Sequence, residues 1–222
     1  MNEAIDKYWE LRLEVCKRAL ISNNFDTYIV KDTGEALKLV MNEIIPGTDA
    51  RKFGYAGSLT VEETGILDEI RNNPDFEVVE TFGKPSKNME EVMERARHAL
   101  LVDMFITGTN AVTETGTLVN LDMWGNRVSA LAYGPKYVVI ITGRNKLVAD
   151  LDKAMERVRT YAAPVNTIRH NMKRPRQTPC VKTSICHDCN DDWRICNVWT
   201  INEKSFPKGR IKVVLVNEDL GF

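Results

Sequence analysis

The sequence predicts an α/β protein whose mainly parallel sheet is covered on both faces. First, short apolar segments alternate with amphipathic helical segments along most of the first 107 residues. Second, strand-like segments follow one another without a helix between residues 107 and 142, which favours a β-rich insertion or a hairpin beside the parallel core. Third, an apolar strand-like segment follows a polar, cysteine-bearing stretch, which indicates that this stretch folds back onto the sheet.

The first half of the chain is expected to begin with a helix over residues 2–23. Apolar residues such as Trp9, Leu13 and Cys16 recur there at three- and four-residue steps. A second helix spans 33–45, because Thr33 can cap its start and Pro46 closes its end. The remaining elements of this half are strands at 25–30, 52–55 and 76–80, a helix after the glycine turn at 57–60, and an amphipathic helix at 88–100.

The second half is expected to be richer in strands. Strands are predicted at 103–107, 117–120, 128–132 and 137–142. A long helix over 146–161 is stopped by Ala163-Pro164, since proline removes a backbone donor from a helix interior. The organisation that follows is a single domain with an α/β core over 1–164, a cysteine-rich segment over 165–207 and a strand returning to the core within 208–222.

Length, charge and hydropathy exclude several classes of protein. The chain has 222 residues, 43% of them apolar, and a net charge of −1, so a protein built mainly to coat nucleic acid is not expected. The longest apolar run, Tyr137 to Ile141, is far below the roughly 20 residues of a membrane span. The acidic start of the chain lacks the pattern of a signal peptide, so a cytoplasmic location is expected.

Four cysteines form the sharpest local signal. Their spacing is Cys180-x5-Cys186-x2-Cys189-x6-Cys196, within 17 residues. In a reducing compartment, clustered thiolates indicate tetrahedral zinc or an iron–sulfur cluster before disulfides. The single Cys-x2-Cys favours an iron–sulfur cluster, with zinc as the alternative; buried, incidental cysteines are the other interpretation.

Basic residues surround the cysteines, and they could have either of two roles. Their charge could offset that of a thiolate-ligated cluster or dock an acidic redox partner. Alternatively, they form a solvated surface loop. The residues concerned are Arg169, Lys173, Arg174, Arg176, Lys182 and Arg194.

A threonine-rich loop over 106–120 directly follows a predicted strand, where ligand loops of open α/β sheets are found. Glu114 is its only titratable side chain and is therefore the candidate general base or nucleophile. The alternative is that the threonines favour β structure and Glu114 is an exposed strand residue. The candidate ligand-binding residues of this loop are Thr107, Thr109, Asn110, Thr113, Thr115 and Asn120.

Two further segments could complete an anion-binding edge. The turn containing Gly57 and Ser58 lies between a strand and a helix and could present backbone N–H groups to a phosphate or carboxylate. Taken alone, the turn favours the alternative of a plain capped turn. Arg144 and Lys146 follow another strand and offer cations at the same edge. Together these segments predict a small anionic metabolite as the ligand.

Several of these residues carry a family resemblance. The sequence resembles the lactate-utilization (LUD) domain family, best known from the LutC/YkgG-type proteins, over nearly its whole length. The matching motifs are the run 103–120, Gly125-Asn126-Arg127, Gly134-Pro135, Gly143-Arg144-Asn145-Lys146 and Arg194-Ile195-Cys196-Asn197. The resemblance implies a Rossmann-like sheet similar to those of ribose-5-phosphate isomerase, glucosamine-6-phosphate deaminase and the CoA transferases.

The resemblance also implies a role in oxidising lactate to pyruvate beside iron–sulfur partner proteins. Longer family members carry a Cys-x2-Cys-x2-Cys run that this chain lacks, so Cys180–Cys196 is a different site. The first hypothesis is therefore a cluster-bearing accessory protein of hydroxy-acid metabolism. The second is an isomerase-like or acyl-transfer enzyme using Glu114, and the third is a binding or scaffolding protein with structural zinc.

Overall fold

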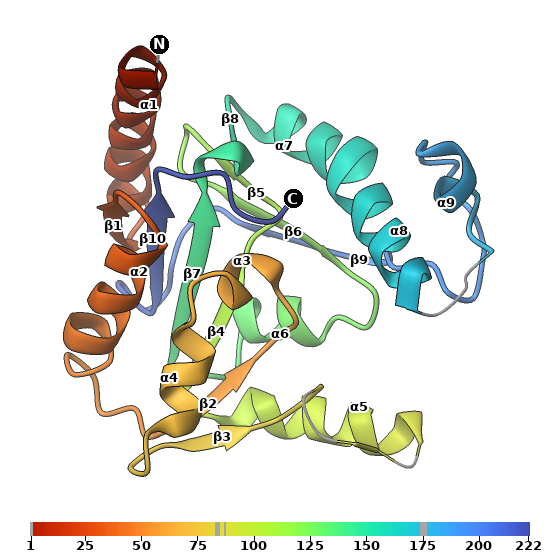
Figure 1. Ribbon diagram of the computed structural model, residues 1–222, viewed down its shortest axis with the longest axis horizontal. Coiled ribbons are helices and arrows are strands. Elements are labelled where there is room, and N and C mark those ends of the chain that lie inside the picture. The colour runs from red at the N-terminus through yellow and green to blue at the C-terminus, as the bar shows by residue number, and fades with distance from the viewer. Residues whose placement is uncertain (1, 83–84, 87, 174–176) are drawn as a thin grey trace.

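The computed structural model describes residues 2–82, 85–86, 88–173 and 177–222 (Figure 1). A six-stranded sheet forms its centre, with the strand order β1-β10-β7-β4-β2-β3 and parallel pairing throughout. The strands are β1 (Asp26–Val30), β2 (Lys52–Tyr55), β3 (Glu77–Val79), β4 (Met104–Gly108), β7 (Tyr137–Gly143) and β10 (Ile211–Val216). The predicted α/β class with a mainly parallel sheet is confirmed.

A second, four-stranded sheet lies beside the first, with the order β8-β5-β6-β9. Its strands are β5 (Ala111–Thr113), β6 (Leu118–Asp122), β8 (Leu147–Val148) and β9 (Val198–Asn202). β5 and β6 pair antiparallel, which is the hairpin predicted between residues 107 and 142. β9 pairs antiparallel with β6 and returns the chain from the cysteine segment to the body of the protein.

Helices cover both faces of the parallel sheet. On one face, α2 (Thr33–Leu39), α3 (Leu59–Glu62) and α4 (Ile66–Asn72) pack against Val139 and Ile141 of β7. The alternate residues Val138 and Ile140 face α1 and the second sheet, because successive side chains of a strand point to opposite faces.

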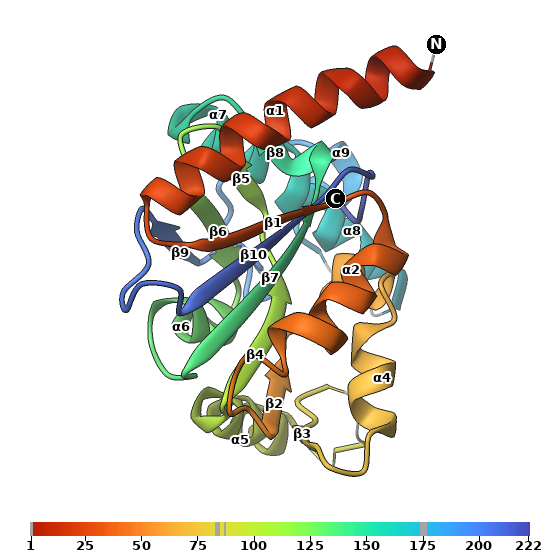
Figure 2. The same ribbon diagram turned by 90° about the vertical axis from the view of Figure 1, so that its left-hand side faces the viewer.

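The other helices flank this core. Figure 2 shows α1 running alongside β1, and α7 packs on the far side of the second sheet. The bounds are α1 (Asn2–Ser22), α5 (Met89–His98), α6 (Asn126–Ala132), α7 (Leu151–Arg157), α8 (Ala163–Lys173) and α9 (Pro179–Thr183), with π-helical turns at Val40–Ile44 and Val158–Ala162 and 3-10 turns at Ala99–Leu101 and Arg144–Lys146. Within the described ranges, no helix is long and apolar enough to cross a membrane.

The predicted strand at 128–132 is wrong, because these residues belong to α6. Gly125, in the left-handed conformation, precedes the helix, and its carbonyl accepts the Ser129 N–H at 2.8 Å. The alternation that suggested a strand is equally compatible with one helical face, since Val128 and Leu131 are both buried and stand three residues apart. Five residues are too few to distinguish the two-residue period of a strand from the 3.6-residue period of a helix.

The predicted helix at 146–161 is also wrong at both ends. It begins after Asp150, whose side chain accepts the Lys153 N–H at 2.9 Å, and it continues through Pro164 to Lys173. A π turn stands directly before the proline, where the Ala163 N–H bonds to the Val158 carbonyl five residues back. This wider turn accommodates a residue that cannot donate a backbone hydrogen bond.

Substitution of Gly116 is expected to destabilise the protein more than substitution at most other positions of the β5–β6 hairpin. Its φ is +82°, and a Cβ atom there would lie 2.6 Å from the Ala19 carbonyl carbon of α1. Gly116→Ala should lower the free energy of unfolding by about 2–4 kcal/mol in urea denaturation. Gly65→Ala is the matched control, with φ at +71° but no atom within 4 Å, and should cost about 1 kcal/mol. Equal losses would contradict the proposed clash with α1.

Candidate functional site

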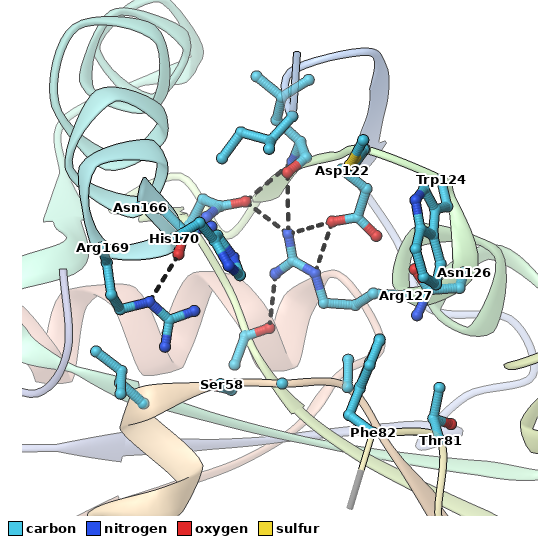
Figure 3. A pocket seen from close by; sticks show the side chains of 18 of the residues that line it. Ser58, Thr81, Phe82, Asp122, Trp124, Asn126, Arg127, Asn166, Arg169 and His170 are labelled. Carbon is cyan, nitrogen blue, oxygen red and sulfur yellow. Dashed lines mark hydrogen bonds and ion pairs between the residues drawn. The ribbon is translucent and has the colours of Figure 1, made fainter. Parts of the chain in front are cut away.

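A cavity of about 1020 Å³ lies at the carboxyl ends of β2 and β4 (Figure 3). Its walls include residues 56–60, which follow β2, residues 108–110 at the end of β4, and Lys146, which follows β7. The chain leaves β2 toward β3 on one side and leaves β4 toward β7 on the other. Open α/β sheets bind ligands in the crevice where neighbouring connections diverge in this way.

Close packing brings the glycine turn and the end of β4 together. A Cβ atom on Gly108 would lie 2.7 Å from Ser58 Oγ, so any larger residue would require the Ser58 side chain to move. Ser58 occupies the position before α3 but makes no capping hydrogen bond with its side chain. The plain capped turn is therefore not what the structure contains, and the Ser58 side chain lines the cavity instead (Figure 3).

Arg127 braces the floor of the cavity (Figure 3). Its guanidinium donates to Asp122 Oδ1 at 2.6 and 2.9 Å and to Asn110 Oδ1 at 2.7 Å. It also donates to Asn120 Oδ1 at 2.8 Å and to the Gly108 carbonyl at 3.2 Å. Only 13% of the Arg127 side chain and 9% of the Asp122 side chain are exposed. These bonds occupy the guanidinium, so Arg127 positions the loop and its charge is offset by Asp122.

Lys146 is a buried amine at the cavity wall, with 4% of its surface exposed. Its Nζ donates to Thr60 Oγ1 at 2.6 Å, and none of the ion pairs within the described residues includes it. Burial, with the charges of Arg157 and Arg127, lowers the pKa of Lys146 to about 7, against a small opposing effect of Glu63. Both the ammonium and the neutral amine are therefore present near neutral pH.

Arg157 contributes positive charge near Lys146, and no carboxylate among the described residues pairs with it; its guanidinium lies 5.4 Å from the centroid of the Tyr161 ring. Its guanidinium donates to the Asn110 carbonyl at 2.7 Å and to the Asn145 carbonyl at 3.1 Å, both neutral acceptors. These bonds tie the loop after β4 to the turn after β7. Burial lowers the pKa of Arg157, as expected for a cation held away from water.

The remaining walls differ in character from one end of the cavity to the other. Arg169 and His170 of α8 lie at one end, where Arg169 Nε donates to Asn166 Oδ1 at 3.1 Å (Figure 3). Phe82 and Trp124 lie at the opposite end, with ring centroids 5.9 Å apart (Figure 3). The cavity thus combines a cationic end with an aromatic end, which suits an organic anion that also has an apolar part.

The segment after β10 closes the cavity over Lys146. Asn145 holds it, because the Asn145 side chain donates to the Leu220 and Gly221 carbonyls and accepts the Leu220 N–H. Thr60 Oγ1 donates to the Leu220 carbonyl at 3.3 Å. A Cβ atom on Gly221 would lie 2.6 Å from Thr60 Oγ1 and 3.4 Å from Lys146 Nζ, so this backbone packs closely against both side chains.

The predicted site residues divide into two groups. Gly57, Ser58, Thr109, Asn110 and Lys146 line the cavity. Outside it are Glu114, Thr107, Thr113, Thr115, Asn120 and Arg144.

The structure places Glu114 away from the cavity. Its carboxylate pairs with Arg12 of α1, and its backbone N–H bonds to the Val148 carbonyl at 2.8 Å. Thr113 and Thr115 bond to each other through their hydroxyls at 2.8 Å within the hairpin turn. Arg144 Nε pairs with Asp219 at 3.0 Å and is part of the scaffold beside the site.

The cysteine segment is a separate region. Burial raises the pKa of the Cys196 thiol, and the charge of Arg194 opposes this effect. Arg194 donates to the carbonyls of Cys189 at 2.6 Å and Cys196 at 3.1 Å. Among the residues that the structure describes, however, no three His, Cys, Asp or Glu side chains are arranged to hold a metal ion. The cluster stays a prediction, and Arg174 and Arg176 lie outside the described residues.

The far wall of the cavity was missed from the sequence. Asn166, Arg169 and His170 stand at three- and four-residue steps on α8, which is the spacing of one helical face. That spacing could have indicated a polar face. The polar face was not recognised, because the helix was predicted to end at Pro164 and these residues were therefore assigned to a loop.

Comparisons with known proteins agree with this fold. A profile of the LUD domain family matches residues 13–216. The crystal structure of a DUF162 family protein from Deinococcus radiodurans is similar, with a TM-score of 0.51 and 13% sequence identity, covering 94% of this chain and 97% of that chain. At that identity the likeness shows the fold alone. No curated protein matches the sequence significantly.

Proposed function

Because the chain belongs to the LUD domain family, we propose that it functions in the utilization of lactate or a related hydroxy acid, as a protein of the LutC/YkgG type. In this role it binds a small organic anion in the cavity. Lys146 carries this proposal. Its amine is almost wholly buried, lines the cavity and belongs to none of the ion pairs of the described residues. A carboxylate ligand would supply the missing negative charge.

The other charges of the cavity favour the same class of ligand. Arg157, whose charge lowers the pKa of Lys146, donates to backbone carbonyls and lies 5.4 Å from the centroid of the Tyr161 ring, whereas the carboxylate of Asp122 is already paired with Arg127. Arg169 adds a half-buried cation at one end, where burial lowers its pKa. Among the described residues, the cavity lining holds four cationic side chains, Arg95, Arg127, Lys146 and Arg169, against two side-chain carboxylates, Glu62 and Asp122, so the excess of positive charge favours an anion.

Lactate binding should follow the protonation of Lys146. The affinity, measured by calorimetry, should be highest below pH 7 and should fall as pH rises through about 7, by at most tenfold per pH unit, because the neutral amine no longer attracts the carboxylate. Arg169→Gln should weaken binding by about tenfold. Glu114→Gln is the control: its carboxylate pairs with Arg12 outside the cavity, so the affinity should not change. The opposite ranking of these two variants would refute the location of the site.

The cysteine segment supports a second candidate function, that of a redox accessory protein. Arg194 favours it, because its guanidinium donates to the carbonyls of both Cys189 and Cys196 and so links two of the four cysteines. Because the four thiols do not form a ligand set as placed, a bound iron–sulfur cluster, or zinc as the alternative, would have to draw them together. An iron–sulfur redox protein would be the partner of such a cluster.

Metal analysis of protein purified without oxygen tests this second candidate. An iron–sulfur cluster should give about four irons with matching sulfide per chain and visible absorbance that dithionite bleaches. One zinc and no colour would assign a structural role. Replacing Cys186 and Cys189 together with serine should remove the metal in either case. Protein without metal, or metal that survives the double replacement, would exclude a site on these thiols.

A further inference from the structure

We propose that Lys146 is a nucleophile that forms an imine with an aldehyde or ketone bound in the cavity, the carbonyl compound being one that also carries a carboxylate or phosphate. This inference rests on the proposed function, because the same cavity must accept an organic anion. It adds the substrate class, since only a carbonyl group can react reversibly with an amine in this way. It also adds covalent chemistry to a site otherwise described by binding alone.

The surroundings of Lys146 favour an uncharged amine. Nζ is buried, and Thr60 Oγ1 accepts its hydrogen bond at 2.6 Å. The Thr60 hydroxyl directs its own proton to the Leu220 carbonyl at 3.3 Å, so its oxygen lone pair is turned toward Nζ. Arg157 and Arg127 add positive charge nearby, and both effects lower the pKa of Lys146. A neutral amine that donates one proton to Thr60 keeps its lone pair for a carbonyl carbon.

Other buried nucleophilic groups do not compete for this role. Cys16 is fully buried, its Sγ donates to the Thr113 carbonyl at 3.4 Å, and burial raises the pKa of its thiol to about 12. It does not line the cavity. Tyr55 donates to Glu80 and accepts from Arg71, so its hydroxyl is engaged in a network of its own. Lys146 combines a reactive atom with a cavity able to hold a reactant.

The reaction balances without an oxidant or a reductant. The Nζ lone pair attacks the carbonyl carbon, a C–N bond forms, and the carbonyl oxygen takes up a proton to give a carbinolamine. That hydroxyl then leaves as water after a second protonation, while Nζ loses its two protons, one for each proton that the oxygen takes up, and the C=N bond forms. The sum is amine plus carbonyl giving imine plus water. The segment around Gly221 packs against Thr60 and Lys146, and only 4% of Lys146 is exposed, so the amine is shielded from bulk water.

Reductive trapping tests the proposal. The protein is incubated with pyruvate or glyoxylate, the smallest keto and aldehyde acids, in the presence of cyanoborohydride, and peptides are examined by mass spectrometry. We expect one reduced adduct on the peptide that contains Lys146, slowed by excess lactate and formed faster at pH 8 than at pH 6. Lys136→Met, which removes an exposed lysine, should retain the adduct.

Variants at Lys146 complete the test. Lys146→Met and Lys146→Arg should both lose the adduct, and arginine preserves the charge should methionine disturb folding. If lactate binds but neither keto acid is trapped at Lys146, the nucleophile is refuted and the anion site stands. If the adduct forms at Lys146 but lactate does not bind, the nucleophile stands without the hydroxy-acid ligand. Adducts spread over surface lysines, unchanged in Lys146→Met, would also refute the proposal.

Discussion

Lys146→Met should weaken lactate binding at least tenfold and at the same time stabilise the fold. Loss of the ammonium removes a charge-assisted contact, which predicts at least a tenfold lower affinity. The folded protein also no longer has to bury an unpaired charge, and methionine matches the length of the lysine stem. We expect the free energy of unfolding to rise by about 1–4 kcal/mol at pH 6, because the lost hydrogen bond to Thr60 offsets only part of the gain.

The pH dependence of that gain is specific to Lys146. Below pH 7 the lysine is charged in both the folded and the unfolded chain, so the folded state carries the full cost of burial. As pH rises from about 7 toward the ordinary value of 10.5, the folded amine is neutral while the unfolded one still holds its proton. The wild-type protein therefore gains stability with pH, by at most about 1.4 kcal/mol per unit, and the advantage of Lys146→Met shrinks.

Urea denaturation of both proteins at pH 6 and pH 9 measures this effect. Lys136→Met serves as the control, because Lys136 is exposed and pairs with Asp49 at the surface. It should show no comparable stabilisation at either pH. A destabilised Lys146→Met protein at pH 6, or a difference that does not vary with pH, would show that the amine is not an uncompensated buried charge.

Arg127→Met should produce the largest loss of stability among the site variants, about 3–5 kcal/mol. The substitution leaves the Asp122 carboxylate, 9% exposed, without the cation that bonds to it at 2.6 Å. It also removes the donor to Asn110, Asn120 and the Gly108 carbonyl, so the loop that forms the cavity floor is no longer held by these hydrogen bonds. Lactate binding should fall with it, although Arg127 is not expected to contact the ligand.

Arg144→Met is the matched control for Arg127→Met. Arg144 also forms ion pairs, but its partners Asp6 and Asp219 are 54% and 69% exposed, so the change should cost about 1 kcal/mol or less. Adding Asp122→Asn to Arg127→Met should recover part of the lost stability, since it removes the unpaired charge. Similar losses for Arg127→Met and Arg144→Met would contradict the assigned role of Arg127 as a buried brace.

Local sequence patterns predicted most of the fold, because strands that are buried on both faces require continuous apolar runs, and such runs are visible in the sequence. The β7 residues Val138 to Ile141 pack against both layers, so their continuous apolar run is required by the fold. The hydrophobic pattern predicted the wrong element at α6, where five residues fit both the strand period and the helix period. It also predicted a helix end at Pro164, whereas a π turn allows the helix to continue through that proline. The second sheet could be foreseen only as a hairpin, because β9 joins it from the far side of the cysteine segment.

The site was harder to predict, because its contacts join distant parts of the chain. Lys146 could be found from its position after a strand, whereas the burial that lowers its pKa depends on Thr60 and Gly221, far away in the sequence. Glu114 was selected as the only carboxylate of its loop, but its partner Arg12 stands 102 residues earlier. No local pattern reports such a partner, and the ion pair places Glu114 outside the cavity.

The ionisation of Lys146 is the most direct test. NMR titration of protein labelled with ¹³C-lysine, with Lys146→Met identifying the resonance, measures its pKa in the presence and absence of lactate. We expect about 7 in the free protein and a higher value with saturating lactate, because the carboxylate stabilises the ammonium. A pKa near 10.5 that does not respond to lactate would contradict both the buried amine and the anion site built around it.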